Sequence, residues 1–188
     1  MRLIFCIQGI FNSGGMERVL INRVNYLYSN YGYEILIITT DQKNRESFYK
    51  AEKEIEIKDL EINYLDNKKE KFFKRIYLYL KNQNKHKKRL QKIVNEYAPD
   101  FIIAMGDEER FVVPKLKTKA KKVLEHHLER NAIFREKRSI LYRIKDIIFS
   151  KKEEKLVNEY DKFLKPNHDI FYKLCSKHQL KYHTLFEA

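Results

Sequence analysis

The chain of 188 residues has little of what cross-links or interrupts a small domain: two cysteines, three prolines, five glycines and no tryptophan. Cys6 and Cys175 stand towards opposite ends and neither has a CxxC partner, so we expect no disulfide framework and no metal site. No apolar run approaches the length of a membrane span, and residues 3–7 are too few for the core of a signal peptide. These absences predict a reduced, cytoplasmic protein, and any contact with the inner face of the cell membrane must be peripheral.

The sequence is also short of acidic residues relative to basic ones. Lys and Arg number 39 against 26 Asp and Glu, a formal net charge of +13, and 43% of the residues are hydrophobic. The hydrophobic fraction is sufficient for one α/β domain, and the excess positive charge predicts an anionic partner. Charge alone leaves phosphate-rich small molecules, nucleic acid and an anionic membrane surface open.

The order of the apolar patterns predicts an α/β fold with a Rossmann-like, doubly wound and mostly parallel sheet. Residues 3–7 are a continuous apolar run typical of a buried strand, residues 16–31 have helical spacing up to Gly32, and residues 35–39 complete a βαβ unit. Further strands are expected at residues 55–58, 101–104, 122–124 and 162–164, and helices at residues 68–97 with a break near 82–84, around Pro114, and at 133–160. We expect one domain over residues 1–174 and a tail of uncertain structure over residues 175–188.

Ligands of open α/β sheets bind beyond the carboxyl ends of the strands. The loop at residues 8–15, Asp41, the pair Gly106 and Asp107, and His126 should therefore share one edge of the sheet. Glycines at the start of the first helix let a phosphate or a sugar hydroxyl approach backbone N–H groups at the positive end of the helix dipole. Spacing alone leaves two simpler readings open, an ordinary glycine turn and a hydrogen-bonded surface or core histidine.

A longer string is more specific. Residues 14–20 read Gly-Gly-Met-Glu-Arg-Val-Leu after the first strand and are followed by Tyr-Gly-Tyr-Glu at 31–34, before the second strand. This opening resembles that of the family-4 glycosyltransferases, which have the two-domain GT-B architecture. The resemblance continues more loosely through residues 98–103, Glu125-His126 and residues 160–163, and only the first forty residues are distinctive.

The resemblance implies that the chain is the N-terminal, acceptor-binding half of a retaining GT-B enzyme that builds polysaccharide or lipid-linked glycans. By position, Gly14 and Gly15, with Glu17 and Arg18 in the first helical turn, would bind the phosphates of the nucleotide-sugar donor. His126 would face the transferred sugar, and Asp107 is a weaker catalytic candidate from its loop.

The family's donor-domain signature, two glutamates seven residues apart beside a nucleotide pocket, has no credible counterpart in this sequence. We therefore expect the chain to be inactive without a donor domain, and to need no cofactor of its own. A fragment of a longer enzyme and one subunit of a split enzyme both remain open.

The segment at residues 68–92 carries eleven cations against the single acid Glu70, with aromatic and aliphatic residues interleaved. Such a helix suits adsorption to an anionic membrane. The predicted membrane contacts are Lys71, Phe72, Phe73, Lys74, Arg75, Lys87, Lys88 and Arg89.

The basic segment and the fold are compatible with three other interpretations. A solvated helix packed on the sheet by its apolar side is the simple alternative for the segment. A non-enzymatic basic module for membrane or nucleic acid is the alternative function, although nucleic acid is disfavoured because no known binding module is present. A dinucleotide oxidoreductase is suggested by the first βαβ unit and by Asp41 after the second strand. It is disfavoured because the tight GxGxxG turn is missing and the loop at residues 8–15 is too long.

Overall fold

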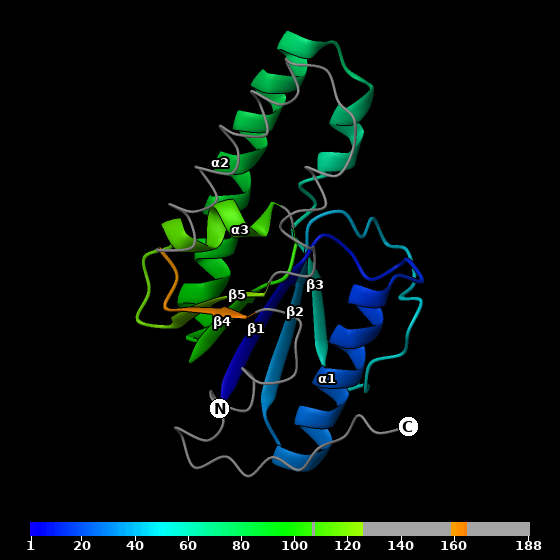
Figure 1. The fold of residues 1–188 in the computed structure, drawn as a ribbon, viewed down its shortest axis with the longest axis vertical. Coiled ribbons are helices and arrows are strands. Elements are labelled where there is room, and N and C mark those ends of the chain that lie inside the picture. The colour runs from blue at the N-terminus through cyan, green and yellow to red at the C-terminus, as the bar shows by residue number, and fades with distance from the viewer. Residues whose placement is uncertain (107, 126–158, 165–188) are drawn as a thin grey trace.

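The computed structural model describes residues 1–106, 108–125 and 159–164, and its centre is a sheet of six parallel strands (Figure 1). The strand order is β3-β2-β1-β4-β5-β6. The strands are β1 (Arg2–Ile7), β2 (Glu34–Thr39), β3 (Glu56–Asp59), β4 (Phe101–Ala104), β5 (Lys121–Glu125) and β6 (Lys162–Leu164). The predicted Rossmann-like, doubly wound α/β fold is confirmed.

The central strand β1 explains why residues 3–7 are apolar without interruption. Ile4 and Cys6 face one hydrophobic cluster, whereas Leu3, Phe5 and Ile7 face the other, so both faces of the strand are buried. Burial also raises the pKa of the Cys6 thiol well above its usual value, so this cysteine is a core residue and not a nucleophile.

Helix α1 (Gly15–Tyr31) covers one face of the sheet. Its buried side chains Leu20, Val24 and Leu27 recur at helical spacing and pack in the same cluster as Phe5. The helix ends as predicted at Gly32, which has the left-handed conformation (φ 61°) and donates its N–H to the carbonyl of Tyr28 at 2.9 Å.

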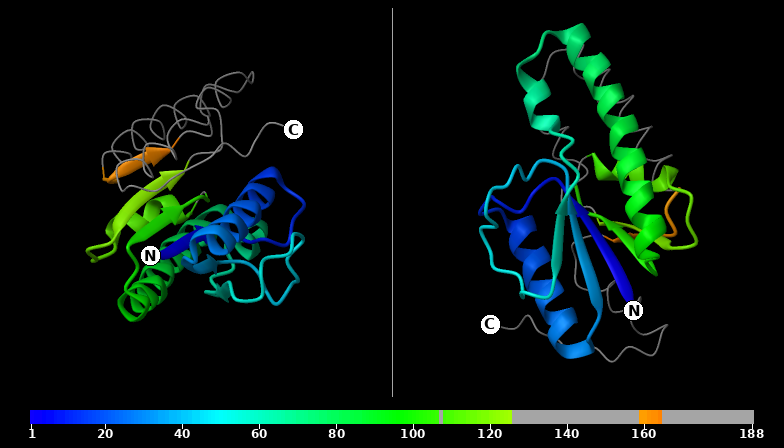
Figure 2. Two further views of the ribbon diagram at one scale, coloured as in Figure 1. Left: turned by 90° about the horizontal axis from the view of Figure 1, so that it is seen from below. Right: turned by 180° about the vertical axis from the view of Figure 1, so that it is seen from behind.

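Helix α2 (Phe72–Tyr97) covers the opposite face (Figures 1 and 2). Its buried apolar residues Leu90, Ile93 and Val94 all belong to its second half. A helix of 26 residues is about 39 Å long, whereas β1 with six residues spans about 20 Å. The first half of α2 therefore extends beyond the sheet, beside the 3₁₀ helix η1 (Tyr64–Lys69).

Two details of the predicted helices were wrong or incomplete. The pattern at residues 68–97 is not one helix, because Glu70 and Lys71 are extended between η1 and α2, and the expected break near residues 82–84 is absent. The short helix around Pro114 is α3 (Glu109–Val112) followed by the 3₁₀ turn η2 (Val113–Lys115). Asp107, His126, residues 133–158 of the helix expected at 133–160, and the tail 175–188 lie outside the described residues.

Candidate functional site

The carboxyl ends of all six strands form one edge of the sheet, because the strands are parallel. The chain leaves β1 through α1 on one face and enters β4 from α2 on the other face. The strand order therefore reverses between β1 and β4, which is the place where ligands bind in open α/β sheets. The loops after β1 and β4 are the first candidates for a functional site.

The loop after β1 is fixed by contacts with the segment that follows β2. The carbonyl of Gln8 accepts a hydrogen bond from the backbone N–H of Asp41 at 2.9 Å. The N–H of Ile10 donates to Gln42 Oε1 at 2.9 Å, and the carbonyl of Ile10 accepts from the N–H of Phe48 at the same distance. Because Ile10 is fully buried, these bonds are shielded from water, and the loop has a defined shape.

The loop delivers the chain to the start of α1, where the predicted phosphate-binding residues lie. Gly14 is the N-cap and makes no side-chain cap, and the first turn contains the buried Glu17. A Cβ placed on Gly14 would lie 2.2 Å from a carboxylate oxygen of Glu17, so this carboxylate rests against the helix start. Gly15 is exposed and has no atom within 4 Å of such a Cβ, and the side chain of Arg18 is exposed. The open approach to the helix start is thus at Gly15.

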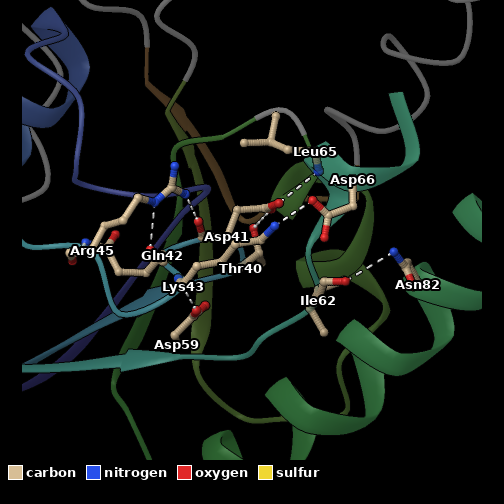
Figure 3. Close-up of polar contacts among 10 residues, drawn as sticks. All are labelled: Thr40, Asp41, Gln42, Lys43, Arg45, Asp59, Ile62, Leu65, Asp66 and Asn82. Atoms are coloured by element: carbon tan, nitrogen blue, oxygen red, sulfur yellow. Dashed lines mark hydrogen bonds and ion pairs between the residues drawn. The ribbon is translucent and has the colours of Figure 1, made fainter. Parts of the chain in front are cut away.

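Asp41, which follows β2, is a structural residue. Its side chain is fully buried, accepts a hydrogen bond from the N–H of Leu65 at 2.8 Å and another from Thr40 Oγ1 at 3.0 Å (Figure 3). Thr40 Oγ1 also lies 3.3 Å from Glu109 Oε1, which belongs to α3. Asp41 therefore joins β2 to η1, and its carboxylate is already engaged within the protein, which argues further against the oxidoreductase alternative.

Neighbouring polar contacts tie the projecting part of the molecule to the same edge (Figure 3). The N–H of Lys43 donates to Asp59 Oδ2 at 2.9 Å, and Lys43 Nζ lies 2.5 Å from Asp66 Oδ1 in η1. Asn82 of α2 donates to the carbonyl of Ile62 at 3.2 Å. Helices η1 and α2 are therefore anchored where β2 and β3 end.

The end of β4 approaches the loop after β1 closely. A Cβ placed on Gly106 would lie 2.1 Å from Glu109 Oε2 and 3.4 Å from the backbone nitrogen of Gln8. Only glycine fits this approach without moving the buried Glu109. The loops after β1 and β4 thus lie together at one edge of the sheet, as expected, while Asp107, the next residue, lies outside the described residues.

The end of β5 is held by an ion pair that sequence analysis missed. The guanidinium of Arg23 in α1 binds both carboxylate oxygens of Glu125, with Nη2 3.0 Å from Oε1 and Nη1 bonded to Oε2. The side chains of Arg23 and Glu125 are 19% and 4% exposed. The pair positions the last residue of β5, immediately before His126, which lies outside the described residues. No local signal could reveal it, because 102 residues separate the partners.

A chain of polar side chains lines the inner side of α2. Tyr64 Oη lies 3.1 Å from Nδ1 of the fully buried His86, and burial lowers the pKa of His86 to about 4. One turn away, Gln83 Nε2 donates to Tyr79 Oη at 3.2 Å and to Glu108 Oε2 at 3.1 Å. Burial, with the charge of Glu108 as a second cause, raises the pKa values of both tyrosines above their usual range, so both hydroxyls stay protonated and neutral.

The predicted membrane residues are placed on several sides of α2. The side chains of Lys71, Lys74, Arg75 and Lys88 are exposed and that of Lys87 is half-buried, whereas nothing is described for the side chain of Phe72. Arg89 donates from its guanidinium to the carbonyl of Leu60 and lies 3.7 Å from Glu61. Phe73 is 84% exposed, together with Ile76, Tyr77 and Leu80 further along the helix.

The described part of the chain contains neither a candidate metal site nor a candidate membrane span. Residues 1–106, 108–125 and 159–164 contain no cluster of three or more His, Cys, Asp or Glu that could hold a metal ion. Among the described helices, none is long and apolar enough to cross a membrane.

Comparison with solved structures relates this fold to sucrose-phosphate synthase from Thermosynechococcus elongatus, a GT-B glycosyltransferase. The TM-score is 0.61 at 9% sequence identity, and the match covers 95% of this chain. The chain has a glycosyltransferase-like fold. It spans 45% of the length of the synthase. No protein-family model matches the chain, and no curated protein matches it either.

Proposed function

We propose that the chain is the acceptor-binding half of a retaining GT-B glycosyltransferase that transfers a sugar from a nucleotide sugar to a lipid-linked or polysaccharide acceptor. The observation that carries the proposal is the coincidence of two features. The fold is glycosyltransferase-like, and its strand-order reversal carries the Gly-Gly-x-Glu-Arg helix start by which the sequence resembles family-4 enzymes. The finer terms of the proposal, retention and the acceptor class, rest on that resemblance.

The geometry at the start of α1 suggests a separate role for each residue there. The exposed amide end at Gly15 and the side chain of Arg18 would neutralise the leaving diphosphate, because backbone N–H groups at a helix start stabilise developing negative charge. The carboxylate of Glu17 would repel a phosphate, so we assign it to holding the helix start against Gly14. His126 and Asp107 keep their proposed roles beside the transferred sugar.

The donor would be held mainly by a second domain, either on the same polypeptide or on a separate subunit. The match to less than half of the synthase supports this division. In such an arrangement, the edge between β1 and β4 would form this chain's side of the cleft between the two domains.

Acceptor binding by the chain alone tests the proposal. The ligands are a polyprenyl-diphosphate-linked monosaccharide and the same polyprenyl diphosphate without the sugar, both in neutral detergent micelles, with binding followed by microscale thermophoresis. We expect tighter binding of the sugar-bearing lipid, because an acceptor site must recognise the hydroxyl groups that receive the donor sugar. Equal binding of the two lipids would instead favour the non-enzymatic basic module.

Transfer after addition of a donor domain tests the role of Gly15. The variant Gly15→Val should fold, because the space around a Cβ is open there, but its side chain would cover the amide end of α1. Losing one such donor typically lowers turnover about 100-fold. Ser29→Val, at an exposed position near the other end of α1, is the matched control and should transfer sugar as the unmodified chain does. Equal activity of both variants would refute the assignment of Gly15.

A further inference from the structure

The first half of α2 presents an apolar face to solvent. Phe73, Ile76, Tyr77 and Leu80, here called the α2 stripe, are 84%, 45%, 64% and 58% exposed. They are spaced three and four residues apart, so they lie on one face of the helix. Four exposed large side chains on one helical face are more than the scattered apolar residues of an ordinary surface.

The stripe is exposed because of where α2 sits on the sheet. Packing on the sheet uses the second half of the helix, where His86, Leu90 and Val94 are buried. The first half extends past the sheet, so no strand can cover it (Figure 1). Burial of these apolar side chains therefore requires something outside the described fold.

The surroundings of the stripe are basic. Lys74, Lys81 and Lys88 recur every seven residues, which places them in a row along one flank of the stripe, and all three are exposed. Lys74 pairs with Glu70 at 2.9 Å, whereas Lys81 and Lys88 form no ion pair among the described residues. The only acid within α2 is Glu96, near its far end.

We propose that this face docks the protein on an anionic lipid bilayer, with the α2 stripe inserted among the headgroups and Lys81 and Lys88 lying against the lipid phosphates. Interfacial helices combine an apolar face with a cationic flank in this way, and lysine stems reach from the apolar level to the headgroups. The proposal does not depend on the proposed transferase activity.

Two other occupants fit less well. A second copy of the chain would bring another net charge of +13 to the interface, and like charges repel. A neutral protein partner would have to desolvate lysines, which are depleted in protein interfaces. The docking face also differs from the set predicted from sequence. Ile76, Tyr77 and Leu80 join it, and Arg89 leaves it because its guanidinium binds Leu60 and Glu61.

A tryptophan probe tests insertion directly, because the chain contains no tryptophan. Tyr77→Trp places the probe in the stripe, and Phe48→Trp places it at a position that is 59% exposed on the loop between β2 and β3. With vesicles of phosphatidylcholine and phosphatidylglycerol, the fluorescence of Tyr77→Trp should shift to shorter wavelength and be quenched by brominated acyl chains. Phe48→Trp should show neither effect. Equal responses of the two probes, or none from Tyr77→Trp, would overturn the proposal.

Co-sedimentation tests the lysine row. Each basic side chain near an anionic surface is worth at most about fivefold in partitioning, so Lys81→Gln with Lys88→Gln should weaken vesicle binding up to about 25-fold. The matched control, Lys117→Gln with Lys119→Gln, removes the same charge from exposed positions before β5 and should bind as the unmodified chain does. If both pairs of substitutions weakened vesicle binding equally, binding would depend on net charge alone, and the proposed docking face would be refuted. Preferential binding of duplex DNA at the same salt concentration would assign the row to nucleic acid instead.

Discussion

The buried His86 makes the stability of this protein depend on pH in a direction that can be worked out. Its side chain is fully buried and burial lowers its pKa to about 4 from the ordinary value of 6.5. The folded state therefore binds a proton more weakly than the unfolded state. The stability associated with the neutral ring is fully present above pH 6.5 and is lost as the pH falls towards 4.

The size of this effect follows from the two pKa values. Each pH unit between them contributes about 1.4 kcal/mol, so the full loss is about 3 kcal/mol and the loss between pH 7.5 and pH 5 is about 2 kcal/mol. The free energy of unfolding of a typical domain is roughly 5–15 kcal/mol, so a change of this size is easily measured. Below pH 4 the folded protein also takes up the proton, and the dependence levels off.

Urea unfolding of the unmodified chain and of His86→Gln, followed by circular dichroism at pH 7.5, 6 and 5, isolates this contribution. Glutamine can still pair with Tyr64 but does not titrate. The other five histidines are present in both proteins, so their effects cancel in the difference. The stability gap between the two proteins should narrow by about 2 kcal/mol from pH 7.5 to pH 5. A gap that stays constant to within about 0.5 kcal/mol, roughly the error of such differences, would refute a neutral, desolvated His86.

The remaining predictions concern the frame of the candidate site and use the same unfolding assay. Arg23→Met leaves the carboxylate of Glu125 buried without its guanidinium and should cost about 3 kcal/mol, and a loss below about 1 kcal/mol would mean that water reaches the pair. Gly32→Ala should cost about 1 kcal/mol, because φ is 61° although the space around a Cβ is open. Gly15→Ala is its matched control with equally open space, and it should be neutral or slightly stabilising, so equal losses would contradict the conformational explanation.

The order of strands and helices could be predicted because it depends on local patterns. The apolar runs at residues 3–7 and 35–39 are typical of strands that are buried on both faces. They lie in β1 and β2. Gly32 ended α1 where the left-handed conformation was needed. Such signals lie within fewer than about ten consecutive residues, so they do not depend on tertiary contacts with the rest of the chain.

The incorrect break in α2 shows what local patterns omit. Residues 82–84 are polar and look like a helix interruption, yet Asn82 bonds to Ile62 and Gln83 to Tyr79 and Glu108. The side chains of Asn82 and Gln83 are satisfied by these contacts, so they do not compete with the helical backbone. The interruption occurs instead at Glu70 and Lys71, where neither glycine nor proline marks it.

The position of the candidate site could be predicted from the sequence, but its tertiary contacts could not. Parallel strands place the loops after β1 and β4 together, so Gly14, Gly15 and Gly106 were expected at one edge. The pair of Arg23 with Glu125 spans 102 residues, and that of Thr40 with Glu109 spans 69. Nothing in either neighbourhood specifies the partner, because these contacts exist only once the sheet has formed.

The placement of α2 connects the proposed transferase activity with the proposed docking face. A crossover helix runs antiparallel to the strands of its sheet, so α2 begins at the carboxyl edge, and its first half projects from that end of the molecule (Figure 1). Docking through the α2 stripe would therefore hold the edge between β1 and β4 towards the bilayer rather than away from it. A lipid-linked acceptor confined to that bilayer would be presented at a raised effective concentration, whereas a soluble acceptor would gain nothing from docking. The same enzyme should thus lose efficiency on lipid-linked acceptors, and keep it on soluble ones, when Lys81 and Lys88 are neutralised.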